Sequence, residues 1–189
     1  MKTNILKTAF ALLFAITLAS FTTLKDKAVK VADSEITWKG HKVTGEHSGT
    51  ITLKEGKLTF EGDELKGGSF VMDMTTINTT DMEGEYKQKL DGHLKADDFF
   101  GVEKFPTASL KFTKVEGAGG TYKVTADLTI KGITNPVTFD LAVAGNTATS
   151  ALKIDRTKYG IKYGSATFFD GIKDKAIYDE FDLNVNLKF

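Results

Sequence analysis

The sequence of 189 residues contains no cysteine, only two prolines and no excess of either charge. Without thiols, the chain can form no disulfide framework, no Cys-ligated zinc site, no thiol nucleophile and no cysteine-linked lipid anchor. Its 25 basic and 25 acidic residues cancel, so it lacks the positive field that would hold a nucleic-acid backbone. Nucleic acid is therefore not expected as a partner. The hydrophobic fraction of 41% is typical of one globular domain.

The sequence also lacks the local motifs of common catalytic and metal sites. It has no G-x-S-x-G elbow, no H-E-x-x-H pair and no G-x-x-x-x-G-K loop. His41, His47 and His93 do not have the spacing of metal ligands. Adjacent residues of an extended chain point in opposite directions, so neither Asp97-Asp98 nor Asp155-Arg156 presents two groups to one substrate atom. The aspartates are interpreted as helix or turn caps, and Arg156 is expected to have a structural ion pair or a hydrogen-bonding role. We therefore predict no catalytic residue, no metal and no cofactor.

The first twenty residues have the layout of a secretory signal peptide. An N-terminal segment that contains lysine precedes the apolar run Ala9–Ile16, and this run is followed by small residues. The run is shorter than a membrane-spanning helix requires. We therefore predict a leader over residues 1–20, cleaved near Ala19 or Ser20. The mature domain, residues 21–189, is expected to be periplasmic or secreted, without a stable membrane anchor.

The remaining sequence has the pattern of an antiparallel β meander, in which segments rich in Thr, Val, Ile and Phe alternate with turn clusters. Every second residue is apolar in Thr121–Ile130 and again in Phe181–Phe189. The apolar faces must be buried by closing the sheet into a barrel or by stacking two sheets. The predicted strands are Ile36–His41, Gly49–Leu53, Lys57–Glu61, Gly68–Thr75, Ala108–Glu116, Thr121–Ile130, Pro136–Ala144, Ala148–Asp155 and Lys175–Phe189. The predicted turns are Glu55-Gly56, Gly117–Gly120, Thr134–Pro136 and Gly145-Asn146.

One segment has helical spacing. Apolar residues recur at every fourth position from Tyr86 to Leu94, and Thr80 and Glu83 have the spacing of a capping box. We predict one helix between Thr80 and Ala96. The adjacent rings of Phe99 and Phe100 are expected to turn inward, so that this segment forms a lid over one end of the sheet.

The apolar residues expected on inward faces are the candidate ligand-binding residues, together with those of the predicted lid. The interior of a barrel of about eight strands is either just filled by side chains or holds one small ligand. The residues alone leave these two alternatives open. The candidates are Trp38, Phe60, Phe70, Met72, Met74, Leu90, Phe99, Phe100, Leu110, Phe112, Leu128, Ile130, Phe139, Leu152, Ile154, Phe168 and Phe181.

Three stretches of the chain, Asp91–Pro106, Asp127–Val137 and Ile154–Ile161, resemble the YceI-like family of exported bacterial proteins. The resemblance extends in order from about Val29 to Phe189. It implies an all-β fold, an extended eight-stranded antiparallel lipocalin-like barrel with one helical lid segment. It also implies that the lumen holds a long apolar chain, a polyisoprenoid or a similar amphiphile.

From this resemblance we predict a non-catalytic protein that carries or sequesters a lipid-like small molecule with an isoprenoid chain. The oligomeric state is left open, a dimer included. One alternative is a barrel packed shut, with a structural or stress-related role in the cell envelope and no ligand. Another alternative is an enzyme that acts on quinone-like or lipid substrates.

Overall fold

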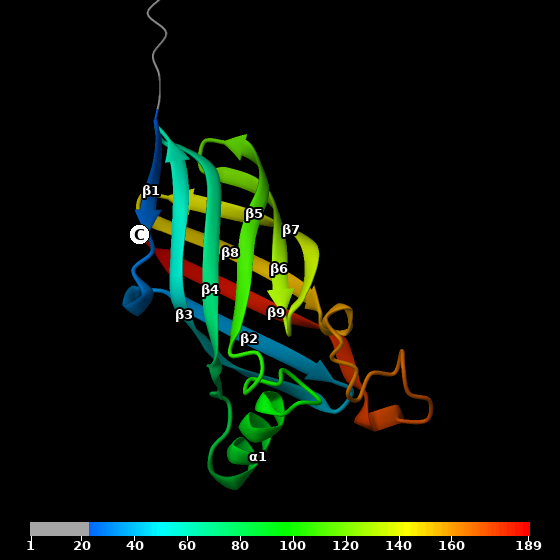
Figure 1. The fold of residues 1–189 in the computed structure, drawn as a ribbon. Coiled ribbons are helices and arrows are strands. Elements are labelled where there is room, and N and C mark those ends of the chain that lie inside the picture. The colour runs from blue at the N-terminus through cyan, green and yellow to red at the C-terminus, as the bar shows by residue number, and fades with distance from the viewer. Residues whose placement is uncertain (1–22) are drawn as a thin grey trace, which may run out of the picture.

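The computed structural model describes residues 23–189, which form a closed eight-stranded antiparallel barrel with one α-helix and a short additional strand (Figure 1). The predicted leader over residues 1–20 lies outside the described residues. No helix within residues 23–189 is long and apolar enough to cross a membrane. The elements are β1 (Leu24–Ala28), β2 (Glu35–Lys42), β3 (Gly45–Glu61), β4 (Glu64–Thr79), α1 (Gly84–Lys95), β5 (Thr107–Ala118), β6 (Thr121–Ile130), β7 (Ile133–Ala144), β8 (Thr147–Asp155) and β9 (Ile177–Lys188), with short 3₁₀ turns at Val31–Asp33, Arg156–Tyr159 and Lys173–Lys175.

The barrel closes because β3 pairs with both β2 and β4, while β9 lies between β8 and β2. The predicted eight-stranded antiparallel barrel with one helical segment is thus confirmed. The additional strand β1 pairs with Lys57–Glu61, the half of β3 that extends beyond β2. Sequence analysis did not predict β1, because its sequence LKDKA has no alternation of apolar and polar residues.

The predicted turn at Glu55-Gly56 is wrong, because β3 continues through it as one strand of 17 residues. A register shift against β4 between Leu53 and Glu55 absorbs the irregularity, as a β-bulge does. A side chain at Gly56 would place its Cβ 2.6 Å from the ring of Phe70, so the glycine permits close approach of the two strands. The turn signal in the sequence therefore marks a bulge.

The predicted turn at Thr134–Pro136 is also wrong. The β6–β7 turn consists of Lys131 and Gly132, with φ angles of 52° and 73°, and β7 begins at Ile133. Two successive residues with positive φ are the requirement of a type I′ hairpin turn. Pro136 therefore lies inside a strand.

The predicted helix is confirmed as α1, which lies beyond the ends of β3 and β4 (Figure 1). The predicted capping box is wrong, because Glu83 precedes the helix without making a side-chain cap bond. Thr80 instead donates from its backbone N–H to the Ser48 carbonyl at 2.9 Å. This bond ties the chain to β3 ahead of the helix, which begins at Gly84.

Candidate ligand-binding site

The barrel lumen contains two apolar cavities. The first, of about 100 Å³, lies toward α1, and Met74, Phe100 and Phe181 contribute to its walls. The second, of about 80 Å³, lies farther from α1, and Phe70, Phe112 and Phe139 contribute to its walls. Beyond the second cavity, the ring of Phe60 packs against Phe189 with their centroids 5.6 Å apart. The lumen is therefore hollow along part of its length and packed at the end away from α1.

Four aliphatic side chains line both cavities, and we call them the waist: Ile36, Met72, Leu128 and Leu183. They come from four different strands, β2, β4, β6 and β9, so they encircle the lumen. Met72 is the most adaptable of them, because an unbranched thioether rotates about three bonds. The two apolar cavities therefore adjoin within the lumen, with the waist between them.

Most of the candidates from the sequence contribute to the cavity walls. The first cavity is lined by Trp38, Met74, Phe99, Phe100, Ile130 and Phe181, the second by Phe70, Leu110, Phe112, Phe139 and Leu152, and both by Met72 and Leu128. The period-two alternation placed these strand residues, because inward positions on a strand are two residues apart.

Four candidates line neither cavity. Phe60 is buried at the packed end, and Ile154 is buried in the wall beside the first cavity. Leu90 is half-buried on α1. The assignment of Phe168 to an inward strand face is wrong, because the side chain is 45% exposed in the loop that precedes β9. The residues around Phe168 do not alternate between apolar and polar, so the sequence does not indicate which way its side chain points.

Sequence reasoning missed several residues of the first cavity. Ile51 and Ala108 are apolar wall residues on predicted strands, whereas Ile77 lies beyond Thr75, where its strand was predicted to end. His41 and Glu180 also line this cavity, and no pattern in the sequence indicated this. They lie on β2 and β9, which pair with each other. The surface of the cavity is almost entirely apolar, and we call its lining residues His41, Arg156 and Glu180 the polar rim.

Arg156, the single arginine of the chain, is buried at this rim with 2% of its surface exposed. Its guanidinium donates to the carbonyl oxygens of Ile161, Ile177 and Tyr178 at 2.9, 3.0 and 3.0 Å. Burial lowers the pKa of Arg156, and the Asp179 and Asp155 carboxylates oppose this effect. The hydrogen-bonding role expected for Arg156 is confirmed, since it fastens the loop after β8 to the start of β9.

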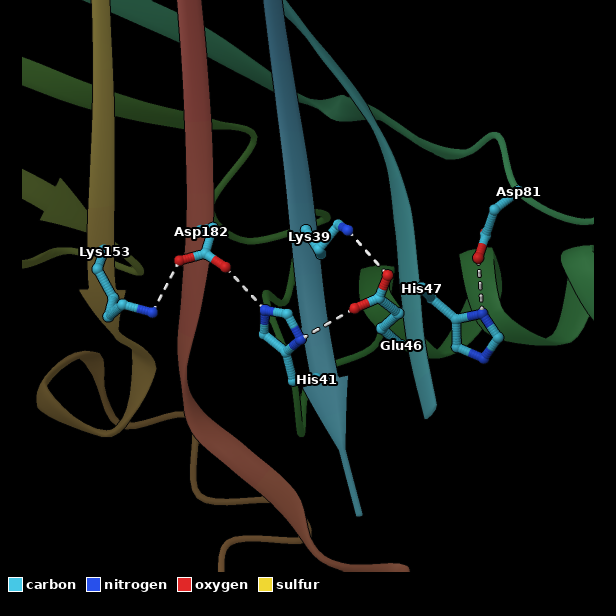
Figure 2. Close-up of polar contacts among 7 residues, drawn as sticks. All are labelled: Lys39, His41, Glu46, His47, Asp81, Lys153 and Asp182. Atoms are coloured by element: carbon cyan, nitrogen blue, oxygen red, sulfur yellow. Dashed lines mark hydrogen bonds and ion pairs between the residues drawn. The ribbon is translucent and has the colours of Figure 1, made fainter. Parts of the chain in front are cut away.

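A chain of polar contacts links side chains of neighbouring strands on both sides of His41 (Figure 2). The Asp182 carboxylate lies 2.7 Å from His41 Nε2 and 2.9 Å from Lys153 Nζ. These hydrogen bonds from His41 and Lys153 lower the pKa of Asp182. His41 also lies 3.4 Å from Glu46, which accepts from Lys39 at 2.8 Å. The contacts link β8, β9, β2 and β3 at the end where the cavity has its polar rim.

These polar groups do not form a recognisable metal centre. Within residues 23–189, no three His, Asp or Glu side chains gather in a way that could hold a metal ion. His47 contacts Asp81 at 3.1 Å as a separate pair (Figure 2). The almost entirely apolar cavities are suited to holding an apolar chain.

Comparison with known proteins gives matches in sequence and in fold. The family model of the YceI-like domain matches residues 14–189. Protein YceI of Escherichia coli O157:H7 is 34% identical over 94 residues, which cover 50% of this chain and 48% of that protein. The chain thus matches about half the length of such curated relatives.

Two solved structures are similar in fold. BcnA of Burkholderia cenocepacia gives a TM-score of 0.68 at 22% identity and covers 84% of this chain and 98% of its own. A polyisoprenoid-binding domain from Saccharophagus degradans gives a TM-score of 0.62 at 15% identity and covers 87% of this chain and 97% of its own. At these identities the likeness concerns the fold.

Proposed function

The chain belongs to the YceI-like domain family, and from this premise we propose that it is an exported, non-catalytic binding protein that holds a long apolar chain in its barrel lumen. The observation that carries the proposal is the pair of adjoining apolar cavities joined at the waist. The proposed ligand is a polyisoprenoid or a similar amphiphile, which the similarity to a polyisoprenoid-binding domain supports. The proposed location is the periplasm or the exterior, after removal of a leader over residues 1–20.

The affinity would come from burial of apolar surface. Each Å² removed from water contributes about 25 cal/mol, so several isoprenoid units suffice for micromolar binding after the costs of association. A polar head group would lie at the rim, where His41, Arg156 and Glu180 line the first cavity. The apolar chain would then pass through the waist toward Phe139 in the second cavity.

The direct test is native mass spectrometry of protein purified gently from its own cells, followed by extraction with organic solvent. We expect an adduct that disappears after extraction and that is restored when the extracted protein is incubated with a polyisoprenol. Protein that carries no adduct and takes up no lipid would instead support the packed barrel without a ligand.

Replacement of Phe100 by Ala tests the lid. Phe100 lines the first cavity, is 7% exposed and contacts the ring of Phe99 with a centroid distance of 5.2 Å. Loss of the ring removes part of the wall that would contact the ligand. We expect the Kd for dansyl-undecanoic acid, measured by fluorescence titration, to rise about tenfold, equivalent to about 1.4 kcal/mol.

Phe60→Ala is the matched control, because Phe60 is buried but lines neither cavity. Truncation of a buried Phe costs about 3–5 kcal/mol of folding free energy, which urea denaturation measures. The folded fraction of this control should bind the probe with the parent affinity. Unchanged affinity in Phe100→Ala would remove the lid from the proposed site.

A further inference from the structure

The barrel wall has a side gap between β7 and β8. The two strands pair only where Leu141–Ala144 faces Thr147–Ser150. Both strands continue beyond this point, β7 back to Ile133 and β8 on to Asp155. Over that stretch, β7 remains fully paired with β6 and β8 with β9. The β7–β8 ladder therefore stops halfway along its strands. The β4–β5 ladder is also partial, since only Ser69–Asp73 of β4 pairs with β5, but there the ring of Phe112 lies against Gly68.

The sequence explains why the gap does not close. Continued β7–β8 pairing would bring Asp140 opposite Ala151 and Pro136 opposite Asp155, by extension of the observed register. Pro136 has no N–H to donate to that ladder. The Asp140 carbonyl already accepts a hydrogen bond of 2.7 Å from the Ser150 hydroxyl. The β7 edge thus lacks one donor and has one acceptor already engaged, which disfavours a complete ladder.

A groove of about 210 Å³ occupies the gap on the outside of the wall. Thr138 and Lys153 belong to its outer lining, and Val137 and Leu152 to its apolar lining. Leu152 also lines the second cavity. Val137 packs against both parts of the hydrophobic core. One layer of apolar side chains therefore separates the groove from the lumen.

The end covered by α1 is fastened more firmly. Lys131 donates to the carbonyl oxygens of Asp97 and Phe99 at 2.8 and 2.7 Å. The side chains of Phe99 and Phe100 are each 7% exposed, so displacing this segment would break hydrogen bonds and expose two buried rings. Separation of the side chains in the gap breaks no ladder hydrogen bond.

We propose that the side gap is the route by which a single apolar chain passes into the lumen, with Leu152 and Val137 as the side chains that move aside. This inference rests on the proposed binding function. The ligand class is a flexible chain one hydrocarbon wide, because a fused-ring molecule would require the strands themselves to separate. Rotation of a Leu and a Val side chain is a far smaller change than displacement of the lid.

The absence of native cysteine makes the test direct. A Thr138→Cys/Lys153→Cys variant, bridged by a short bismaleimide, fixes the width of the gap. The control is a Lys111→Cys/Asp127→Cys variant bridged in the same way, because these residues face each other on the continuous β5–β6 ladder. Stopped-flow fluorescence then gives the uptake rate of cis-parinaric acid, a linear fluorescent fatty acid without a ring, and an equilibrium titration gives its Kd.

We expect bridging of the gap to slow uptake at least tenfold, to leave the Kd within twofold of the parent value, and to have no comparable effect in the control. Equal uptake rates in the two bridged proteins would overturn the gap as the route. An unbridged parent that fails to bind the probe would overturn the proposed binding function instead, so the two failures are distinguishable.

Discussion

Replacement of Met72 by Phe is expected to abolish binding of dansyl-undecanoic acid and to change the melting temperature only slightly. Met72 belongs to the waist and lines both cavities, so a phenyl ring there would occupy the passage through which the chain must extend. The free space on both sides lets the ring settle without the strain that overpacking causes in a filled core. Isothermal titration measures the affinity, and calorimetric melting measures the stability. Leu128→Phe, at the same waist, is expected to act in the same way.

Leu58→Phe provides the control for this experiment. Leu58 is fully buried and lines neither cavity. Enlarging it should cost about 1–3 kcal/mol in the free energy of unfolding while the affinity for the probe persists. If Met72→Phe and Leu128→Phe both unfold readily and the parent binds no lipid, the binding function is wrong and the lumen is packed.

Replacement of Arg156 by Met is expected to cause the largest loss of stability among exchanges of charged residues. The variant would leave the carbonyl oxygens of Ile161, Ile177 and Tyr178 without their donor. A buried polar group that loses its partner retains its desolvation cost, so the free energy of unfolding should fall by about 3–5 kcal/mol. Urea denaturation measures this loss. Hydrogen exchange should show faster exchange over residues 160–177 than over β6.

Two further variants separate geometry from charge. Arg156→Lys keeps the positive charge but lacks the planar fork of donors, so it should recover less than half of the loss. Lys153→Met removes an exposed ion pair with Asp182, for which a change below about 1 kcal/mol is expected. Full stability in Arg156→Lys would show that charge alone suffices and would contradict the role of the three hydrogen bonds.

Much of the barrel could be predicted from the sequence because its strands bury one face and expose the other. The bounds of β6 agree with the prediction, since Tyr122, Val124 and Ala126 alternate without interruption with exposed residues. The same alternation placed Met72 and Leu128 on inward faces. The prediction that the sheet closes into a barrel came from the family resemblance, because alternation of apolar and polar residues is equally compatible with a barrel or a sandwich.

The features that were missed depend on partners far away in the sequence. β1 is a strand only because the end of β3 offers it an unpaired edge. The polar rim depends on the pairing of β9 with β2, the strands that carry Glu180 and His41. The side gap depends on the missing N–H of Pro136 and on the hydrogen bond that the Ser150 hydroxyl donates. Both act at the β7–β8 ladder, which cannot be identified from the sequence. Local patterns carry no information about such encounters.

The pairing of β2 with β9 also determines when the site can come into existence during folding. It joins Glu35–Lys42 to Ile177–Asn186, so almost the whole chain must be available before the ring closes. Contacts of such long sequence separation are formed slowly, because a large loop must first be ordered. Trp38 and Leu183, which are paired in this ladder and both line the first cavity, lie near opposite ends of the chain. The hairpins between neighbouring strands from β5 to β8 can form early. The lumen is enclosed only in the last step, when β2 pairs with β9.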